Sequence, residues 1–422
     1  MSKISVSGVD RLEGRVRVQG SKNAVLPILA AALINEKECI IHNCPDLSDV
    51  KAVCNILKCI GCTVEFKNGT VTVNSAGANN YVVPCELMKC IRSSFVFMGA
   101  LLARFKKAVM CLPGGCPIGA RPVDMHIKAL NCLGCMVEQT DENIFSAQCI
   151  SAIGGVVNLD FPSVGATENI MMYACKGMGI TQIHNAALEP EICDLANFLN
   201  SMGANIYGAG TKNITIYGVE KLESAEYTVM ADRIEQSTLM SAVCMTGGKL
   251  ELFDCCNSCL NIYTEFLKKL GCDITIYNEK KLKLVSDGKM LKDGACVKIC
   301  TEPYPGFPTD CQSLAMTLVA ASYGRSIIEE NIFENRMNHA FELNKMGADI
   351  KLKGNCAFVN GVGKLCGCEV CARDLRSGAA LVAAGLAATG RTIVNNAEYI
   401  YRGYECLENK LSYLGADAER IE

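Results

Sequence analysis

The sequence predicts an α/β protein assembled from six copies of one structural unit, and three recurring patterns carry this prediction. One is the end of an amphipathic helix followed by glycine and the start of a strand, as in ILKCIGCTV and FLKKLGCDI. The second is a segment rich in Ala, Leu and Met, such as KNAVLPILAAAL or RSGAALVAAGLA. The third is a short apolar strand, such as ECIIHN or TIVNNA, which follows each of these segments. Repetition at a fixed period indicates an architecture of equivalent units.

The glycines of the first pattern define the period. They stand at positions 61, 134, 203, 271, 347 and 415, which are about 70 residues apart, so that six units fill the chain. Glycine suits this place because the residue that ends a helix often takes a left-handed conformation, in which a Cβ atom is costly.

Each unit is predicted to run from a buried helix to a strand, a polar loop, an amphipathic helix and two further strands. The Ala/Leu/Met-rich segments are apolar on nearly all sides, so we expect these helices inside the protein. They start near residues 22, 92, 166, 233, 310 and 376. Domain size favours two groups of three units, each of about 200 residues. In each group the buried helices should lie side by side with their N-termini at the same end.

Composition excludes several classes of function. The net charge is −3 and no stretch is strongly basic, which argues against a nucleic-acid partner. The longest apolar runs, such as residues 24–34, are too short to span a bilayer, and the N-terminal residues do not resemble a signal peptide. We therefore expect a cytoplasmic protein, with no membrane partner and with most of its 27 cysteines acting as small buried hydrophobic residues.

Several cysteine clusters could be redox or metal sites. The pairs CIGC (59–62) and CLGC (132–135) fall where other units have SMGA or YLGA, so a structural role is favoured. The clusters CCNSC (255–259) and CGCEVC (366–371) have no histidine nearby, and a metal is disfavoured there too.

Charged residues recur where the buried helices start and in the polar loops. They are Lys22, Arg92, Arg233, Asp310 and Arg376 at helix starts, and Arg121, Arg336 and Arg402 in loops. Any one of them could be an ordinary surface cation. As a set they predict a shared anion site, because helix N-termini present unpaired N–H groups and the positive end of the helix dipole.

Three residues carry alternative interpretations. Asp310 and Asp374 each precede a buried helix, so each is either an N-terminal cap or a carboxylate that acts as a general base in a basic cleft. Cys116 lies in CLPGGCPIGARPVDMH, a segment too rich in glycine and proline for a helix or strand. It is either an inert loop cysteine or a thiol whose pKa is lowered by Arg121 and which can reach a substrate.

Motifs along the whole chain resemble those of the UDP-N-acetylglucosamine 1-carboxyvinyltransferases, a family of enolpyruvyl transferases. They are GSKNA, MKCIRSS, PGGCPIGARPVDMH, PSVGATENI, EPEICDLANFL, DRIE, PGFPTDCQ, IFENRMNHA, RDLRSGAALV and RGYE. The resemblance implies two domains, each of three βαβαββ units around a pseudo-threefold axis, an inside-out α/β barrel with the active site in the interdomain cleft. One domain would be 22–230, which carries the Cys116 loop, and the other 1–21 plus 231–422.

The resemblance also implies the reaction, with no metal and no organic cofactor. The enolpyruvyl group of phosphoenolpyruvate would pass to the 3′-hydroxyl of UDP-N-acetylglucosamine with release of phosphate, at the start of peptidoglycan precursor synthesis. Cys116 would donate a proton to the methylene carbon, Asp310 would be the base, and Asp374 would lie beside the reacting carbons. Lys22, Arg121 and Arg402 would bind phosphoenolpyruvate, and Arg336 and Arg376 would complete the anion cluster. The residues implied for the nucleotide sugar are Asn23, Arg92, Arg121, Pro122, Val123, Asp124, Met125, Ser163, Val164, Gly165, Asp310 and Ile332.

The sequence departs from the family pattern in two places. Gln236 and Ser237 stand where two small residues are expected, and Tyr401 stands where Asp usually precedes Arg402.

Two rival functions remain. One is a 5-enolpyruvylshikimate-3-phosphate synthase, against which the cysteine loop and the absence of DKS and SGT helix starts argue. The other is a paralogue that only binds a nucleotide sugar, which would not need both an acid and a base. The sequence does not predict the oligomeric state.

Overall fold

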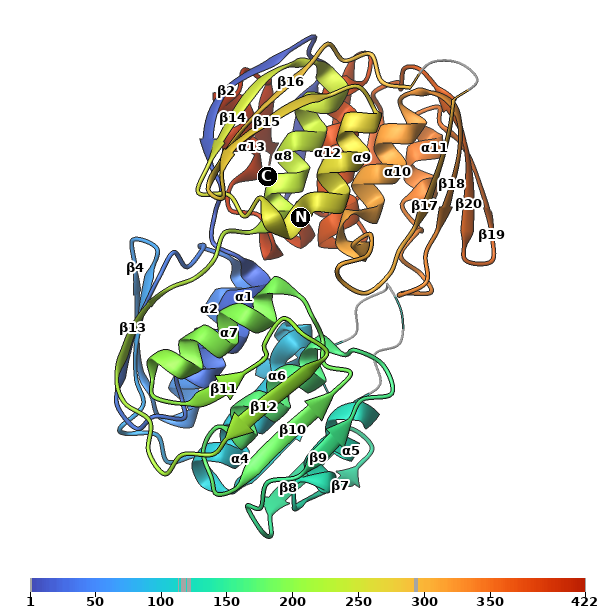
Figure 1. Ribbon diagram of the computed structural model, residues 1–422. Coiled ribbons are helices and arrows are strands. Elements are labelled where there is room, and N and C mark those ends of the chain that lie inside the picture. Colours follow the sequence, from blue (N-terminus) through green and yellow to red (C-terminus); the bar gives the residue numbers. More distant parts are fainter. Residues whose placement is uncertain (1, 113, 115–118, 120–122, 292–294, 422) are drawn as a thin grey trace. The chain divides into compact units, whose positions relative to one another are not determined.

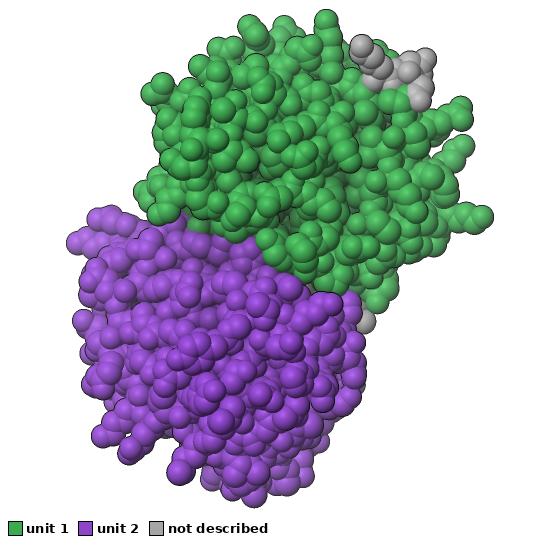
Figure 2. Space-filling view, in the orientation of Figure 1, with its two compact units in different colours: residues 1–19, 117–120, 231–422 green, residues 20–116, 121–230 purple. Residues whose placement is uncertain are grey.

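The computed structural model describes residues 2–112, 114, 119, 123–291 and 295–421, with the backbone alone for Arg92 and Ser93. Contacts divide the chain into two compact units (Figure 2). Unit 1 contains residues 1–19, 117–120 and 231–422, and unit 2 contains residues 20–116 and 121–230. Each unit has its own hydrophobic core. No helix among the described residues is both long and apolar enough to cross a membrane.

Buried helices form the centre of each unit, as the sequence predicted (Figure 1). In unit 2 they are α1 (Lys22–Ala31), α4 (Phe97–Phe105), which continues the 3-10 helix η1 (Arg92–Val96), and α6 (Val164–Ala174). In unit 1 they are α8 (Arg233–Thr246), α10 (Gln312–Ala320), which follows η3 (Thr309–Cys311), and α12 (Leu375–Ala387). Every residue of α8 and α10 is buried. Helices α8, α10 and α12 contact one another pairwise.

A second set of helices follows the polar loops and is amphipathic. These are α2 (Ser48–Ile60), α5 (Asp124–Cys132), α7 (Pro190–Ser201), α9 (Asn261–Lys269), α11 (Ala340–Lys345) and α13 (Leu407–Tyr413). Short helices α3 (Cys85–Cys90), η2 (Ser258–Leu260) and η4 (Ala397–Arg402) complete the set. The six glycines that follow the amphipathic helices all have positive φ, from 82° at Gly134 to 105° at Gly61, which confirms their left-handed caps. At Gly203 an added Cβ would meet no atom within 4 Å, so the conformation alone favours glycine there.

In the part of the chain that the structure describes, six separate sheets surround the buried helices, so that each repeat has its own sheet. In unit 2 their orders are β13-β3-β5-β4, β6-β8-β7 and β11-β12-β10-β9. Their strands are β3 (Glu38–His42), β4 (Thr63–Lys67), β5 (Thr70–Asn74), β6 (Lys107–Cys111), β7 (Cys135–Asp141), β8 (Ile144–Cys149), β9 (Val156–Asn158), β10 (Ile180–His184), β11 (Asn205–Tyr207), β12 (Asn213–Tyr217) and β13 (Ala225–Thr228).

In unit 1 the sheet orders are β15-β16-β14-β2, β17-β18-β20-β19 and β21-β22-β1-β23. Their strands are β1 (Lys3–Ser7), β2 (Leu12–Arg17), β14 (Gly248–Phe253), β15 (Asp273–Asn278), β16 (Lys281–Ser286), β17 (Cys296–Cys300), β18 (Tyr323–Glu329), β19 (Asp349–Lys353), β20 (Cys356–Val362), β21 (Glu369–Cys371), β22 (Arg391–Asn395) and β23 (Ala418–Ile421). In each four-stranded sheet one strand pairs in parallel with the strand after the buried helix, as β2 does with β14, and the other pairings are antiparallel.

Among the described cysteines, two pairs are joined as disulfides, Cys85 with Cys111 and Cys256 with Cys259, and neither bond was predicted from the sequence. The C-x-x-C pairs at 59–62 and 132–135 are not bonded, in agreement with a structural role. Burial raises the pKa of many of the other thiols, for example that of Cys175 to about 12, so that these cysteines behave as small hydrophobic residues.

Candidate functional site

Asp310 lies at the centre of a cluster of arginines in unit 1. Its Oδ1 atom accepts a hydrogen bond from Arg336 at 2.6 Å and from Arg376 Nε at 3.3 Å. Asp310 and these two partners come from the starts of α10 and α12 and from the loop before α11. The predicted convergence of helix starts is therefore confirmed in this unit.

The cluster holds Asp310 as a charged carboxylate. Burial opposes its ionisation, but the positive charges of Arg376, Arg336 and Arg233 outweigh burial and hold the pKa of this carboxyl well below its usual range. The side chains of Arg336 and Arg376 are about 4% and 3% exposed, whereas that of Asp310 is 25% exposed. The carboxylate is thus the solvent-facing member of a buried charged group.

Helix caps position two of these arginines. Arg233 is the first residue of α8, and Asp232 before it accepts from the N–H groups of Ile234 and Glu235. Arg376 is the second residue of α12, whose cap is Asp374. The Arg376 guanidinium also lies 5.8 Å from the centre of the Tyr404 ring.

Asp374 is an N-terminal cap. Its Oδ1 atom accepts from the N–H groups of Arg376 at 2.9 Å and Ser377 at 3.1 Å, and the Ser377 side chain completes a capping box. Of the two interpretations of Asp374, the structure therefore supports the cap directly. Asp310 differs, because its carboxylate bonds to arginines and no cap bond from it is present in η3.

Glu330 connects the Asp310 segment to the Ile332 segment. This buried carboxylate accepts from the hydroxyl of Thr309 at 3.0 Å and from the N–H groups of Ile332 at 2.9 Å and Phe333 at 3.1 Å. The structure thereby places Ile332 close to the turn that presents Asp310. Arg336 follows in the same loop, and the buried His339 ring contacts its carbonyl oxygen at 3.2 Å.

Arg402 ends η4 and is partly buried. Its neighbour Tyr401 bonds through its hydroxyl to Glu408 at 3.3 Å and stacks under Arg420, with 4.9 Å between the guanidinium carbon and the ring centre. The unusual Tyr401 is therefore part of the packing of η4 against α13 and β23.

In unit 2, Lys22 forms an ion pair with Asp49 at 2.7 Å, and their side chains are only 9% and 4% exposed. Lys22 begins α1, with the partly buried Asn23 next to it, and Asp49 lies in the first turn of α2. This pairing was not predicted from the sequence. The one feature of the sequence that points to it is Asp49 itself, an acidic residue in the first turn of an amphipathic helix.

A second group of predicted residues lies together where α5 and α6 begin. Asp124 and Met125 start α5, while Ser163 caps α6 by accepting from Ala166 N–H at 3.3 Å, and Val164 and Gly165 follow it. A Cβ atom on Gly165 would lie 3.0 Å from the His126 ring, so the two helix starts are in close contact. Val123 precedes α5 and is partly buried.

Asn169 joins these helix starts to η1 and α4. Its Oδ1 atom accepts from Gly99 N–H at 2.7 Å, and its Nδ2 atom donates to the Phe95 carbonyl at 3.1 Å and contacts His126 Nδ1 at 2.7 Å. Because the amide presents N–H groups to His126, that ring nitrogen accepts and the ring is neutral. Burial agrees, since it lowers the pKa of His126 to about 4.

Three predicted site residues, Cys116, Arg121 and Pro122, lie outside the described residues. Arg92 is described by its backbone alone, as the first residue of η1. Four residues were not among the predicted site residues although they support them, namely Asp49, Arg233, Glu330 and Tyr404. Arg233 was recognised at a helix start but not assigned to the site.

Gln236 and Ser237, which depart from the family pattern, are fully buried in the first turns of α8. Ser237 Oγ accepts from the thiol of Cys311 at 3.3 Å, next to Asp310, and donates to the Ile234 carbonyl at 2.8 Å. Gln236 bonds to the segment around Cys256. Both polar side chains are therefore satisfied, and both connect α8 to a neighbouring segment.

Comparison with known proteins places the chain in a family. The sequence family described as EPSP synthase (3-phosphoshikimate 1-carboxyvinyltransferase) matches residues 6–411. UDP-N-acetylglucosamine 1-carboxyvinyltransferase 2 of Caldanaerobacter subterraneus subsp. tengcongensis is 47% identical over 100% of both chains. The UDP-N-acetylglucosamine 1-carboxyvinyltransferase of Finegoldia magna is 44% identical, over 100% of this chain and 99% of its own. The chain belongs to the UDP-N-acetylglucosamine 1-carboxyvinyltransferase family. It is therefore an enzyme of the transferase class.

Solved structures confirm the fold expected of this carboxyvinyltransferase family. The enolpyruvyl transferase NikO from Streptomyces tendae aligns with a TM-score of 0.88, 22% identity, and coverage of 100% of this chain and 99% of its own. EPSP synthase from Acinetobacter baumannii aligns over 100% of both chains with a TM-score of 0.77 and 18% identity. At these identities the likeness concerns the fold alone.

Proposed function

We propose that this member of the family transfers the enolpyruvyl group of phosphoenolpyruvate to the 3′-hydroxyl of UDP-N-acetylglucosamine and releases phosphate. The reaction would take place in the cytoplasm as the first committed step of peptidoglycan precursor synthesis, and would thereby serve cell shape and division. The observation that carries the proposal is the Asp310 carboxylate held among Arg233, Arg336 and Arg376, in a chain that matches the carboxyvinyltransferases over its full length.

The arginine cluster suits a polyanionic substrate. Phosphoenolpyruvate carries about three negative charges at neutral pH, by the ordinary acidities of phosphate and carboxyl groups. Fixed guanidinium groups bind such an anion and stabilise the leaving phosphate without reorganising during the reaction. We assign the phosphoenolpyruvate contacts to Lys22, Arg121 and Arg402, in an active site that the proposal locates in the interdomain cleft.

Asp310 is the proposed base for the attacking sugar hydroxyl. In the free protein its low pKa makes it a weak proton acceptor, because the arginines stabilise the ionised form. A substrate anion that takes over part of the guanidinium contacts would raise the proton affinity of Asp310. Base catalysis would thus depend on a bound substrate, while Cys116 would supply the proton to the methylene carbon.

Nucleotide-sugar binding is assigned to the helix starts of unit 2. The starts of α5 and α6 present Asp124, Met125 and the Ser163–Gly165 turn side by side. Asn169 and His126 fix these two helix starts to η1, where Arg92 stands. This arrangement supports a rigid platform for a sugar and its phosphates.

Phosphate release from phosphoenolpyruvate tests the proposal. We expect release that requires UDP-N-acetylglucosamine, is not supported by shikimate 3-phosphate, and falls by about 100-fold or more in Asp310→Asn. Release that requires shikimate 3-phosphate instead would identify a 5-enolpyruvylshikimate-3-phosphate synthase. Binding of the nucleotide sugar without any release would identify a protein that only binds it.

A further inference from the structure

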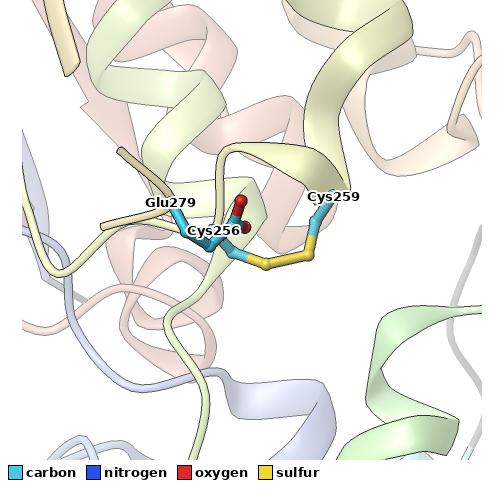
Figure 3. Close-up of side chains that lie close together, drawn as sticks. All are labelled: Cys256, Cys259 and Glu279. Carbon is cyan, nitrogen blue, oxygen red and sulfur yellow. A yellow bond between two sulfur atoms is a disulfide. The ribbon is translucent and has the colours of Figure 1, made fainter. Parts of the chain in front are cut away.

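The disulfide between Cys256 and Cys259 lies just before helix α9 (Figure 3) and joins a partly exposed cysteine to a buried one. Cys256 is the partly exposed member, and Cys259 is about 8% exposed. Their neighbour Cys255 is buried, and burial raises the pKa of its thiol to about 12. Of Cys255, Cys256 and Cys259, only Cys256 is therefore accessible to a small reagent, and it is also the residue bonded to Cys259.

The disulfide segment, residues 256–259, is held on one side by the first part of α8. Gln236 Oε1 accepts from the Cys256 N–H at 3.0 Å, and Gln236 Nε2 donates to Asn257 Oδ1 at 3.0 Å. Asn257 in turn donates to the carbonyl of Asn278 at 2.7 Å. A fully buried glutamine thus uses both ends of its amide to hold the segment that contains the disulfide.

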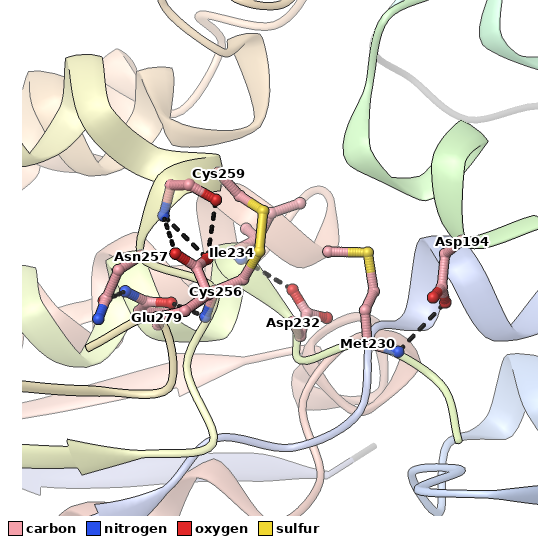
Figure 4. Close-up of a disulfide and its surroundings, with 10 residues drawn as sticks. Asp194, Met230, Asp232, Ile234, Cys256, Asn257, Cys259 and Glu279 are labelled. Atoms are coloured by element: carbon pink, nitrogen blue, oxygen red, sulfur yellow. Dashed lines mark hydrogen bonds between the residues drawn. A yellow bond between two sulfur atoms is a disulfide. The ribbon is translucent and has the colours of Figure 1, made fainter. Parts of the chain in front are cut away.

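The turn between β15 and β16 holds the other side (Figure 4). Glu279 accepts from the N–H of Ser258 at 3.0 Å and from its hydroxyl at 2.7 Å. The carboxylate also lies near both sulfur atoms, since the ligand atoms of Cys256, Cys259 and Glu279 are all within 4.8 Å of one another. The segment is therefore fastened on both sides around a bond that reduction can break.

The same turns of α8 reach the arginine cluster. Gln236 is three residues from Arg233, which contributes to the low pKa of Asp310, and Ser237 bonds to Cys311, the residue after Asp310. A shift of the disulfide segment would act on Gln236 and hence on the part of α8 that carries Arg233. Residues 233–237, at the start of α8, therefore connect the disulfide segment to the arginine cluster around Asp310.

We propose that Cys256 and Cys259 form a reversible dithiol–disulfide pair whose state is transmitted through Gln236 to the first turn of α8. The oxidised pair holds the segment so that both Gln236 bonds are made. Two thiols cannot approach as closely as two bonded sulfur atoms, so reduction pushes the segment apart and weakens those bonds.

The oxidant is a low-molecular-weight disulfide. The Cys256 thiolate attacks one of its sulfur atoms, forming a mixed disulfide and releasing one thiolate. The Cys259 thiolate then attacks the Cys256 sulfur and releases the second thiolate. Two cysteine thiols lose two electrons, the small disulfide is reduced to two thiols, and the two protons pass from the cysteines to the released thiolates.

The first experiment titrates the pair itself and does not depend on the proposed function. The full-length protein is equilibrated in glutathione buffers of graded redox ratio, alkylated, and mapped by peptide mass. We expect Cys256 and Cys259 to change together between dithiol and disulfide, while the matched C-x-x-C pair Cys59 and Cys62 stays reduced. A 256–259 pair that remains as thiols, or as a disulfide, at every ratio would overturn the proposal.

The second experiment tests the coupling. Amide exchange of residues 233–238 should be faster in the reduced protein, and the KM for phosphoenolpyruvate, a readout that rests on the proposed function, should rise by about 2- to 10-fold, as for the loss of one hydrogen bond. Cys256→Ser/Cys259→Ser should show the reduced values under all conditions. Gln236→Met should keep the redox titration but lose the difference in exchange.

Three results would contradict the coupling or the assignment. Equal amide exchange in both redox states of the native protein would disprove transmission through α8, whatever the enzyme assay gives. A Gln236→Met protein that keeps the full difference would exclude the glutamine as the connection. Tight binding of Zn²⁺ to the reduced trio, with Glu279→Gln abolishing it and no disulfide formed by glutathione, would make this a metal site instead.

Discussion

Asp310, Lys22 and Cys116 are the three proposed reactive residues, and what the structure shows of each differs. Asp310 is kept ionised by arginines that a substrate anion would have to recruit. Lys22 is already neutralised by Asp49, so an anion at Lys22 would compete with a carboxylate of the protein itself. Cys116 lies outside the described residues, and its role rests on the motif that surrounds it. Each state leads to its own experiment.

We expect Lys22→Ala and Arg402→Ala each to lower turnover by about 100-fold or more, because each would remove a fixed positive charge from the phosphoenolpyruvate site. Steady-state phosphate release measures this loss. Removing Lys22 also leaves Asp49 buried without that partner, which destabilises a fold. The double variant Lys22→Ala/Asp49→Asn removes both charges and controls for folding. Near-normal turnover in both single variants would refute the assignment of this site.

We expect the epoxide fosfomycin to alkylate Cys116 ahead of the other cysteines, and faster when UDP-N-acetylglucosamine is bound. Burial protects many of the other thiols, and it raises the pKa of Cys44 and Cys62 to about 12. The relevant competitors are the exposed free thiols Cys90, Cys132, Cys296, Cys366 and Cys406. Peptide mass mapping after limited labelling identifies the site. Cys116→Asp should abolish labelling and keep activity, since a carboxylic acid still delivers a proton. Labelling spread over the exposed thiols would make Cys116 an ordinary loop cysteine.

At the scale of elements, buried helix starts perform two tasks. Their caps, such as Asp232 and Asp374, satisfy the first N–H groups, and the residues beside the caps supply the charges of the site. In unit 2 the neutral Asn169 joins the start of α5 to η1 and α4, whereas the start of α1 carries the charged pair of Lys22 and Asp49. The two units thus share one architecture but join their helix starts through different groups.

The Asn169–His126 contact predicts a pH dependence of stability. The folded pKa of His126, about 4, lies below the value of about 6.5 expected in an unfolded chain, so stability is full above pH 6.5 and is lost as the pH falls toward 4. Urea unfolding at pH 8 and pH 5 should show that His126→Gln loses roughly 1–2 kcal/mol less than the native protein over this interval. The matched variant His184→Gln, at a partly exposed histidine, should lose as much as the native protein. Equal losses in all three proteins would contradict a neutral, buried His126.

At the scale of the whole molecule, the residues of the proposed site come from both units. Lys22 and Asp124 belong to unit 2, while Asp310, Arg376 and Arg402 belong to unit 1. A substrate that contacts both sets would favour whichever arrangement of the units brings them together.

We therefore expect saturating UDP-N-acetylglucosamine to reduce the radius of gyration measured by small-angle X-ray scattering. The physical reason is that one ligand whose phosphates and sugar contact residues of both units binds best to the arrangement that brings those residues together. Free N-acetylglucosamine, which lacks the phosphates, serves as the control and should leave the radius unchanged. No change with the nucleotide sugar at saturation would argue against closure of the cleft.

The sequence by itself determined the repeat. Hydrophobic period, glycine position and strand composition are local properties, so they predicted all six buried helices, the six left-handed glycine caps and the strand that follows each buried helix. Family motifs likewise pointed to Asp310, Arg336 and Arg376, because these residues belong to the short motifs PGFPTDCQ, IFENRMNHA and RDLRSGAALV.

Only the tertiary structure decided what those side chains bond to. The pairing of Lys22 with Asp49, the cap made by Asp374, the bridge made by Glu330 and the disulfide between Cys256 and Cys259 all depend on where separate segments meet. Gln236 illustrates the difference. In the sequence it departed from the family pattern without an explanation. In the fold its side-chain amide accepts a hydrogen bond from the N–H of Cys256, 20 residues away. A polar residue inside a helix becomes intelligible only when its partner is known, because burial makes an unsatisfied hydrogen-bonding group costly.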